Sequence, residues 1–161
     1  MYTVPGLRLI PQSKNMACWY ASAQMLIQWR RNRAQATFAD SPDPSEASET
    51  VSWEVKNRGI TNPQVVRLAQ LLGLRPVPPL SPTLSYLAAL LRTRGPLWTN
   101  GKTHIVVIGG IDESASRIQV YDPWPPNVGR VEWRDFTTYL RGGNAARDTG
   151  GDVQAVFLCN P

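Results

Sequence analysis

The order of the hydrophobic patterns constrains this chain most, because helical periodicity fills its first part and strand periodicity its second. From Cys18 to Trp29, apolar and small residues recur at helical spacing, which predicts a helix from about Ala17 to Arg33. After Gly95, short apolar runs alternate with polar turns, as β-strands do. Helices followed by strands indicate an α+β fold in which an N-terminal helical layer packs on a C-terminal antiparallel β-sheet. We expect a single domain over residues 1–161, with a helical half from about 11 to 94 and a sheet half from about 95 to 161.

Prolines and glycines mark the ends of further predicted helices. Pro63 stands at a first-turn position before VVRLAQLLG, and Pro82 does the same before TLSYLAALLRTRG; each run ends at a glycine. The acidic segment Asp40–Glu49 predicts an exposed loop that leads into a helix near Val51–Arg58. The stretch RPVPPLSP, which begins at Arg75, predicts a stiff connector within the domain.

Two predicted strands, His104–Gly109 and Arg117–Asp122, are joined by a short polar turn and predict a hairpin. A turn centred near Glu113 would place His104 directly opposite Asp122 on the neighbouring strand. A slip of one residue would put these two side chains on opposite faces of the sheet. The sequence therefore predicts, on the first of these registers, that its single histidine lies beside a carboxylate.

The chain is moderately basic, with 17 Lys and Arg against 12 Asp and Glu and a net charge of +5. Apart from Arg30, Arg31 and Arg33, the basic residues are scattered and form no clustered stripe, so we expect no nucleic-acid partner. No apolar run approaches the roughly 18 residues that span a bilayer, and we expect no membrane partner. The N-terminal stretch Met1–Ile10 lacks the basic and apolar regions of a signal peptide.

Two cysteines and one histidine limit the metal and disulfide chemistry open to the chain. Cys18 and Cys159 are too few for a disulfide framework or a four-cysteine zinc site. A single histidine also excludes zinc sites with two or three histidine ligands. We therefore predict an enzyme that uses no metal ion and no other cofactor.

Cys18 is the candidate nucleophile because it falls in the first turn of a long predicted helix. Unpaired backbone N–H groups and the positive end of the helix dipole favour a thiolate at such a position. His104 is the only imidazole available as its base, and Asp122 would orient that imidazole through the other ring nitrogen. Gln12, six residues before Cys18, is the candidate amide donor to the oxyanion that forms during acyl transfer.

The segment PQSKNMACWYAS, which begins at Pro11, resembles the nucleophile region of papain-like cysteine peptidases. The order of a Cys, a His that opens a strand and an Asp that ends a later strand is also theirs. The segment YDPWPPNVGRVEWRDF is similar to two bacterial branches, the papain-like effector proteases and the double-glycine leader peptidases. The resemblance implies a papain-like fold in which Cys18, His104 and Asp122 are catalytic and Gln12 belongs to the oxyanion hole.

Two tryptophans receive roles from the same resemblance. Trp19 directly follows the nucleophile, and Trp124 matches the aromatic residue that shields the His–Asp bond from water in papain-like enzymes. The resemblance implies that both line the substrate site. As core aromatics, the common role of tryptophan, they would have no part in binding.

The resemblance implies a cysteine protease that cleaves peptide bonds in a protein target. A compact chain without a signal peptide resembles bacterial effector or interbacterial toxin domains that a specialised secretion system delivers to act in the target cell cytoplasm. A toxin would imply a cognate immunity or inhibitor protein. The same triad would serve a double-glycine leader peptidase, or an amidase, deamidase or acyltransferase, because the pocket rather than the triad selects the substrate. A catalytically silent binding module is the alternative outside enzyme chemistry.

Overall fold

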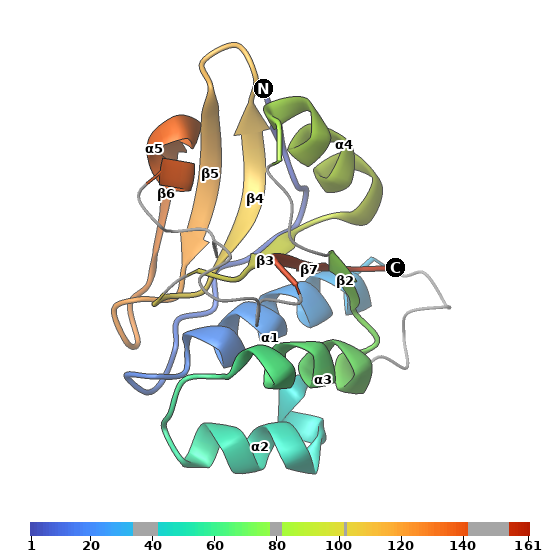
Figure 1. The fold of residues 1–161 in the computed structure, drawn as a ribbon, viewed down its shortest axis with the longest axis vertical. Coiled ribbons are helices and arrows are strands. Elements are labelled where there is room, and N and C mark those ends of the chain that lie inside the picture. Colours follow the sequence, from blue (N-terminus) through green and yellow to red (C-terminus); the bar gives the residue numbers. More distant parts are fainter. Residues whose placement is uncertain (34–41, 78–81, 102, 142–154) are drawn as a thin grey trace.

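The computed structural model describes residues 1–33, 42–77, 82–101, 103–141 and 155–161 (Figure 1). Helices occupy most of its first part and sheet strands most of its second, so the predicted α+β order is confirmed. The elements, in chain order, are β1 (Tyr2–Thr3), α1 (Cys18–Arg31), the 3-10 helix η2 (Pro44–Glu46), α2 (Ser48–Val55), α3 (Asn62–Leu72), β2 (Arg75–Val77), α4 (Leu84–Arg94), β3 (Leu97–Thr99), β4 (Val106–Asp112), β5 (Arg117–Asp122), β6 (Arg130–Asp135), α5 (Phe136–Arg141) and β7 (Phe157–Cys159).

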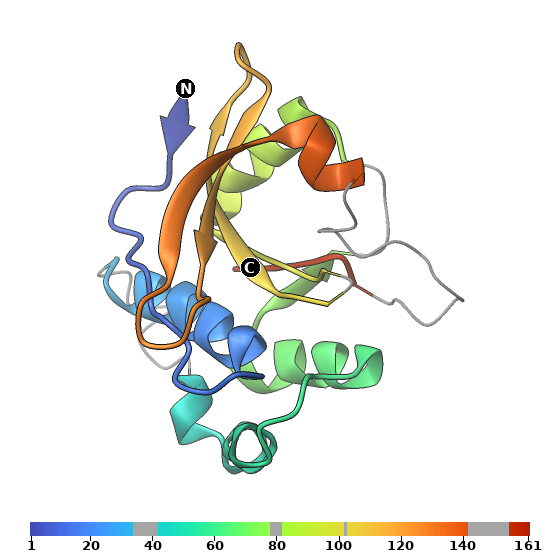
Figure 2. The same cartoon turned by 90° about the vertical axis from the view of Figure 1, so that its left-hand side faces the viewer.

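The strands of the described residues form one antiparallel sheet in the order β2-β7-β3-β4-β5-β6. β5 pairs along one edge of β4, while β3 and β1 share its other edge. β7 lies between β2 and β3, so a C-terminal strand ties a strand of the helical half into the sheet. Figures 1 and 2 show α2 as the helix farthest from the sheet, and β6 sweeping along the sheet toward α5.

Helix ends follow the local sequence. The backbone N–H of Thr61 donates to Gln64 Oε1 at 2.9 Å at the start of α3, which ends at Gly73 in the left-handed region. At the start of α4 the Thr83 hydroxyl accepts from the backbone N–H of Tyr86 at 3.2 Å. Pro82 therefore precedes the N-cap residue instead of standing in the first turn, which corrects that prediction.

Gly95 ends α4 where no larger residue fits. Its φ is 79°, a left-handed conformation that favours glycine. A Cβ atom there would lie 2.1 Å from the ring of Trp29 in α1. The glycine thus allows the end of α4 to approach the end of α1 closely.

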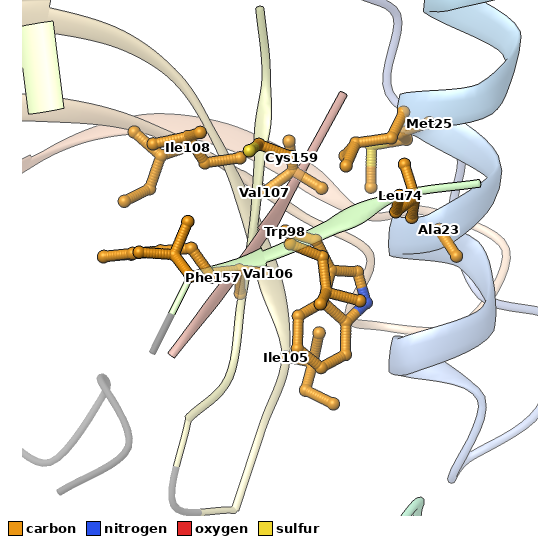
Figure 3. Packing of buried hydrophobic residues seen from close by; sticks show 14 of the residues in the cluster. Ala23, Met25, Leu74, Trp98, Ile105, Val106, Val107, Ile108, Phe157 and Cys159 are labelled. Atoms are coloured by element: carbon orange, nitrogen blue, oxygen red, sulfur yellow. The ribbon is translucent and has the colours of Figure 1, made fainter. Parts of the chain in front are cut away.

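The main core lies between α1 and the sheet (Figure 3). Trp98 of β3 is fully buried, and its indole nitrogen points toward α1, where it donates to the backbone oxygen of Trp19 at 3.1 Å. Ala23 and Met25 of α1 belong to the same cluster, as does Cys159 of β7 with 1% of its surface exposed. This hydrogen bond from the Trp98 indole fixes α1 against β3 at Trp19, the residue after Cys18.

Two segments predicted to be irregular are built into the fold. The start of the predicted connector, Arg75–Val77, is the edge strand β2, where Pro76 is tolerated because edge strands leave backbone groups unpaired. In the described part of the acidic segment, Asp43 and Pro44 are buried, and Asp43 accepts from the backbone N–H of Ser45 at 3.0 Å to begin η2. The segment is thus not simply an exposed loop, and α2 begins and ends three residues earlier than predicted.

The β4–β5 hairpin exists, but its register differs from the predicted one. Ile111 pairs with Ile118 near the turn, and an irregularity between Ile108 and Gly110 leaves Gly109 without a pairing partner in β5, although its carbonyl accepts from the backbone N–H of Val4 at 2.7 Å. Beyond it Val107 pairs with Tyr121, and the same register extended by one residue would place Val106 opposite Asp122. β4 also starts at Val106, so His104 does not open the strand and is not directly opposite Asp122.

Candidate active site

Cys18 is the first residue of α1, as its predicted position in the first turn required. No side chain caps this helix start, and no acidic residue stands in its first turn, so nothing there opposes a negative charge. The thiol is free and half-buried. His104, from the segment before β4, lines the same cavity as Cys18, and its interaction with the thiol raises the pKa of the imidazole.

His104 also contacts Asp122, in spite of the shifted register. Its Nε2 lies 2.6 Å from Asp122 Oδ1. An offset of two residues along a strand keeps a side chain on the same face, whereas an offset of one reverses it. The structure brings His104 to Asp122 directly and places His104 and Cys18 in the wall of one cavity, so Nδ1 is the ring nitrogen that Asp122 does not use.

Asp122 is held by donors on both of its oxygens. Only 3% of its surface is exposed. Oδ1 accepts from the backbone N–H of Trp124 at 3.0 Å, in addition to His104. Oδ2 accepts from Arg134 Nη2 at 3.0 Å, and Arg130 Nε lies farther away at 4.0 Å. A buried carboxylate with this many donors is held in one orientation.

His104 and Asp122 each favour the charged form of the other. Burial by itself lowers the pKa of His104, but its hydrogen bonds to Asp122 and Cys18 and the nearby negative charges outweigh burial and raise that pKa from 6.5 to about 9. Burial likewise favours the neutral form of Asp122, but hydrogen bonds from His104, Trp124 and Arg134 lower its pKa below the usual value. Near neutral pH the pair is an imidazolium and a carboxylate.

Gln12 is buried, and its backbone ties it to the segment after β5. Its N–H donates to the carbonyl of Pro123 at 3.0 Å, and its carbonyl accepts from the N–H of Asn127 at 2.9 Å. Its side-chain Nε2 donates within its own loop, to the carbonyls of Lys14 at 2.8 Å and Asn15 at 2.9 Å. To act on an oxyanion, the amide would have to exchange one of these bonds for the substrate.

The loop between Gln12 and Cys18 is braced from the helical layer. Lys14 Nζ lies 2.7 Å from a carboxylate oxygen of Glu54 in α2. The backbone N–H of Met16 donates to Asn57 Oδ1 at 3.0 Å. These contacts fix the segment that carries the candidate oxyanion donor to the helical layer, which also carries the candidate nucleophile.

The two tryptophans occupy different environments. Trp19 is 1% exposed, donates from its indole nitrogen to the carbonyl of Arg58 at 3.4 Å and packs edge-on against Tyr20. It contributes to the wall of the cavity at Cys18 in spite of this burial. Trp124 is 40% exposed, and its backbone N–H, described above, contacts Asp122. Their roles in substrate binding stay predictions.

A cavity of about 360 Å³ opens beside Cys18 and His104. Among the described residues that line it, His104 is the only ionisable side chain besides the thiol. The remaining lining residues are polar or apolar but uncharged: Asn15, Met16, Trp19, Gly59, Ile60, Asn100, Gly101, Thr103 and Ile105. The sequence did not point to Asn100 or Thr103, because the segment between β3 and β4 carries no motif of its own.

Arg134 is a third residue near the site to which the sequence did not point. A signal was present, since the alternation in RVEWRD places Arg130, Glu132 and Arg134 on one face of β6 beside Asp122.

Among the described residues, no group of three or more His, Cys, Asp and Glu side chains is arranged to hold a metal ion. Within the same ranges, no helix combines the length and apolar character needed to cross a membrane.

Comparison with protein families matches residues 1–141 to the family described as papain-like cysteine protease AvrRpt2, a bacterial effector. A search of curated proteins found no match. The matched region contains the start of α1, the segment before β4 and the β4–β5 hairpin, which contribute the thiol, the imidazole and the carboxylate. The resemblance found in the sequence is thus confirmed over most of the chain, which belongs to the AvrRpt2 family of papain-like cysteine proteases and is a cysteine peptidase.

Proposed function

We propose that the protein hydrolyses peptide bonds in a protein target through Cys18, His104 and Asp122. The observation that carries the proposal is the position of the chain's single histidine, which shares a cavity wall with a half-buried free thiol and lies 2.6 Å from a buried carboxylate. That arrangement supplies a nucleophile, a base that becomes an acid, and a group that orients the base.

In this mechanism Cys18 Sγ attacks the scissile carbonyl, and a carbon–sulfur bond forms. The carbon–nitrogen bond then breaks as imidazolium His104 gives its proton to the leaving amine. Neutral His104 next takes a proton from water, whose oxygen displaces the thiolate and releases the acid. Asp122 keeps the imidazole in place throughout, and the backbone N–H of Cys18 with the Gln12 amide would stabilise the oxyanion.

The test compares native protein with Cys18→Ala and, as a matched control, Cys159→Ala, in a search for new protein N-termini in bacterial and eukaryotic lysates. Cys159 is buried away from the site, so its variant should cut like native protein. Cuts that disappear only with Cys18→Ala support the proposal. Cuts that persist in Cys18→Ala refute it.

The same experiment separates the alternatives. Cuts confined to sites after paired glycines would assign a leader-peptidase specificity. Absence of cuts, with Cys18 still selectively alkylated by a thiol-directed electrophile, would assign amidase, deamidase or acyltransferase chemistry. Absence of selective alkylation would favour a binding module.

We propose further that the protein is an effector or toxin that acts in the cytoplasm of a target cell after delivery by a specialised secretion system. Membership in the family of a bacterial effector supports this setting. If the target is bacterial, the producer needs an immunity protein, and an acidic one would suit a chain of net charge +5. Expression in the target cytoplasm should be toxic only with Cys18 intact, and coexpressed neighbouring reading frames should include one that restores growth. Growth that is unaffected by the native protein would contradict a toxin.

A further inference from the structure

The second oxygen of Asp122 has a partner of its own. Oδ1 serves His104 and the Trp124 backbone, while Oδ2 faces Arg134 Nη2 at 3.0 Å. With 3% of Asp122 exposed, water does not replace that donor easily. The arginine is therefore the main counter-charge on the side of the carboxylate away from the imidazole.

Arg134 is itself held between two carboxylates. Its Nε donates to Glu132 Oε1 at 2.7 Å, and its Nη2 lies 2.5 Å from the same Glu132 oxygen and 3.0 Å from Asp122 Oδ2. Arg130 is directly opposite Asp122 in the β5–β6 ladder, yet its Nε stays 4.0 Å away and its side chain is 52% exposed. β6 thus presents one close, half-buried cation and one distant, solvated cation to the same oxygen.

We infer that Arg134 is a positioning residue of the peptidase, which takes the second oxygen of Asp122 and offsets part of the carboxylate charge that acts on His104. The inference rests on the triad proposed above. His104 must hold a proton while the thiolate attacks and then release it to the leaving amine. A fully unopposed Asp122 would hold that proton more tightly and make His104 a poorer acid.

The charged and titratable groups around the imidazole come from several elements. Cys18 of α1 and Asp122 of β5 contact it directly, and Glu132 and Arg134 act from β6 through Asp122. Tyr139 of α5 is the other titratable group near Asp122 and Arg134; burial raises the pKa of its hydroxyl, which stays neutral over the range of interest. Arg130 of β6 lies farther away, with its Nε 4.0 Å from Asp122 Oδ2, and it is present in native protein and in every variant proposed here. The expected direction therefore follows from the charge that each variant removes. Loss of the Arg134 cation raises the pKa of His104, and loss of the Glu132 anion lowers it.

The experiment is a pH titration of the imidazole signals by NMR, which need no assignment because the chain has one histidine. In Arg134→Met the pKa of His104 should rise by about one unit, the order expected for one partly screened charge near a buried pair. Arg134→Lys, which keeps the cation, should restore most of the native value. The alkaline limb of the peptidase pH profile should move with the titration.

Glu132→Gln keeps the test decisive if Arg134→Met does not fold. Glu132 is 41% exposed on its side chain and tolerates change, and its loss should lower the pKa of His104 by a few tenths of a unit. If the pKa of His104 is unchanged or lowered in folded Arg134→Met, the inference is overturned. It is also overturned if the pKa of His104 is unchanged or raised in Glu132→Gln. A uniform loss of activity in Arg134→Met without a titration shift marks a merely structural role and also overturns it. The titration uses no substrate, so failure of the proteolysis assay would reject the proposed function separately.

Discussion

The raised pKa of His104 makes the stability of the protein depend on pH in a defined direction. The pKa is 6.5 for an ordinary histidine and about 9 in the folded protein, because bonds to Asp122 and Cys18 outweigh burial. A folded-state pKa above the unfolded value stabilises the protein fully below pH 6.5, and this contribution is lost as pH rises through about 9.

The contribution of His104 to the free energy of unfolding follows from the difference between its folded and unfolded pKa values. About 1.4 kcal/mol per pKa unit gives about 3 kcal/mol for the full shift. The imidazole is 33% exposed, so solvent screening reduces the expected contribution to about 2 kcal/mol. That is a large part of the marginal stability of a small domain.

Urea unfolding between pH 6 and pH 10 measures the contribution as a difference between native protein and His104→Gln. Groups that do not interact with His104 titrate alike in both proteins and cancel from the comparison. The free energy of unfolding of the native protein should fall by about 2 kcal/mol more than that of the variant over this range. Parallel curves for the two proteins would show that His104 is not held as a charged partner, and the reasoning would fail.

Three further predictions follow from the geometry. Asp122→Asn should lower kcat less than His104→Ala does, because the amide keeps the shape and one hydrogen bond while losing the charge; steady-state kinetics decides, and equal, negligible losses would place the third catalytic group elsewhere. Gln12→Ala should lower kcat by roughly 10-fold to 1,000-fold at a nearly unchanged KM, and a change in KM alone would contradict an oxyanion role. Gly95→Ala should lower the free energy of unfolding by about 2–4 kcal/mol through its left-handed φ and its 2.1 Å approach to the α1 indole. Gly6→Ala, at a φ of 75° with open space around its Cβ, reports the backbone strain alone in the same unfolding assay, and equal losses would refute the steric argument.

The helices and most strands could be predicted because their signals are local. Periodicity and a closing glycine define α3 and α4, and apolar runs between polar turns define β3 to β6. The strand β2 could not be predicted, because the prolines of RPVPPLSP argue against a strand. Only the tertiary structure reveals that Arg75–Val77 is an edge strand that pairs with β7, where a proline is tolerated.

The candidate catalytic neighbours were predicted from a register that proved wrong, because the turn is centred between Ser114 and Ala115, with Asp112 paired to Arg117, and not near Glu113. This displaces the pairing by three residues near the turn, and the irregularity at Gly109 reduces the displacement to two. A Cβ there would lie 2.4 Å from Leu7 and 2.6 Å from the ring of Tyr121, so a glycine permits close packing where the ladder becomes irregular. The actual offset from direct pairing is two residues, which preserves the face on which His104 meets Asp122. A paired glycine within a strand was the available warning of a bulge.

The hydrogen bond from Trp98 to the backbone of Trp19 bears on the stage of folding at which catalytic activity appears. The thiol belongs to the segment before Gly95, and the imidazole and carboxylate belong to the segment after it. Neither segment holds a complete proposed triad, so catalysis through that triad requires both segments to pack together, and the Trp98 indole joins them beside the candidate nucleophile. Proteolytic activity would then report whether the two segments have packed together. A chain divided at this boundary and supplied as two fragments would cut its target only when the fragments find each other.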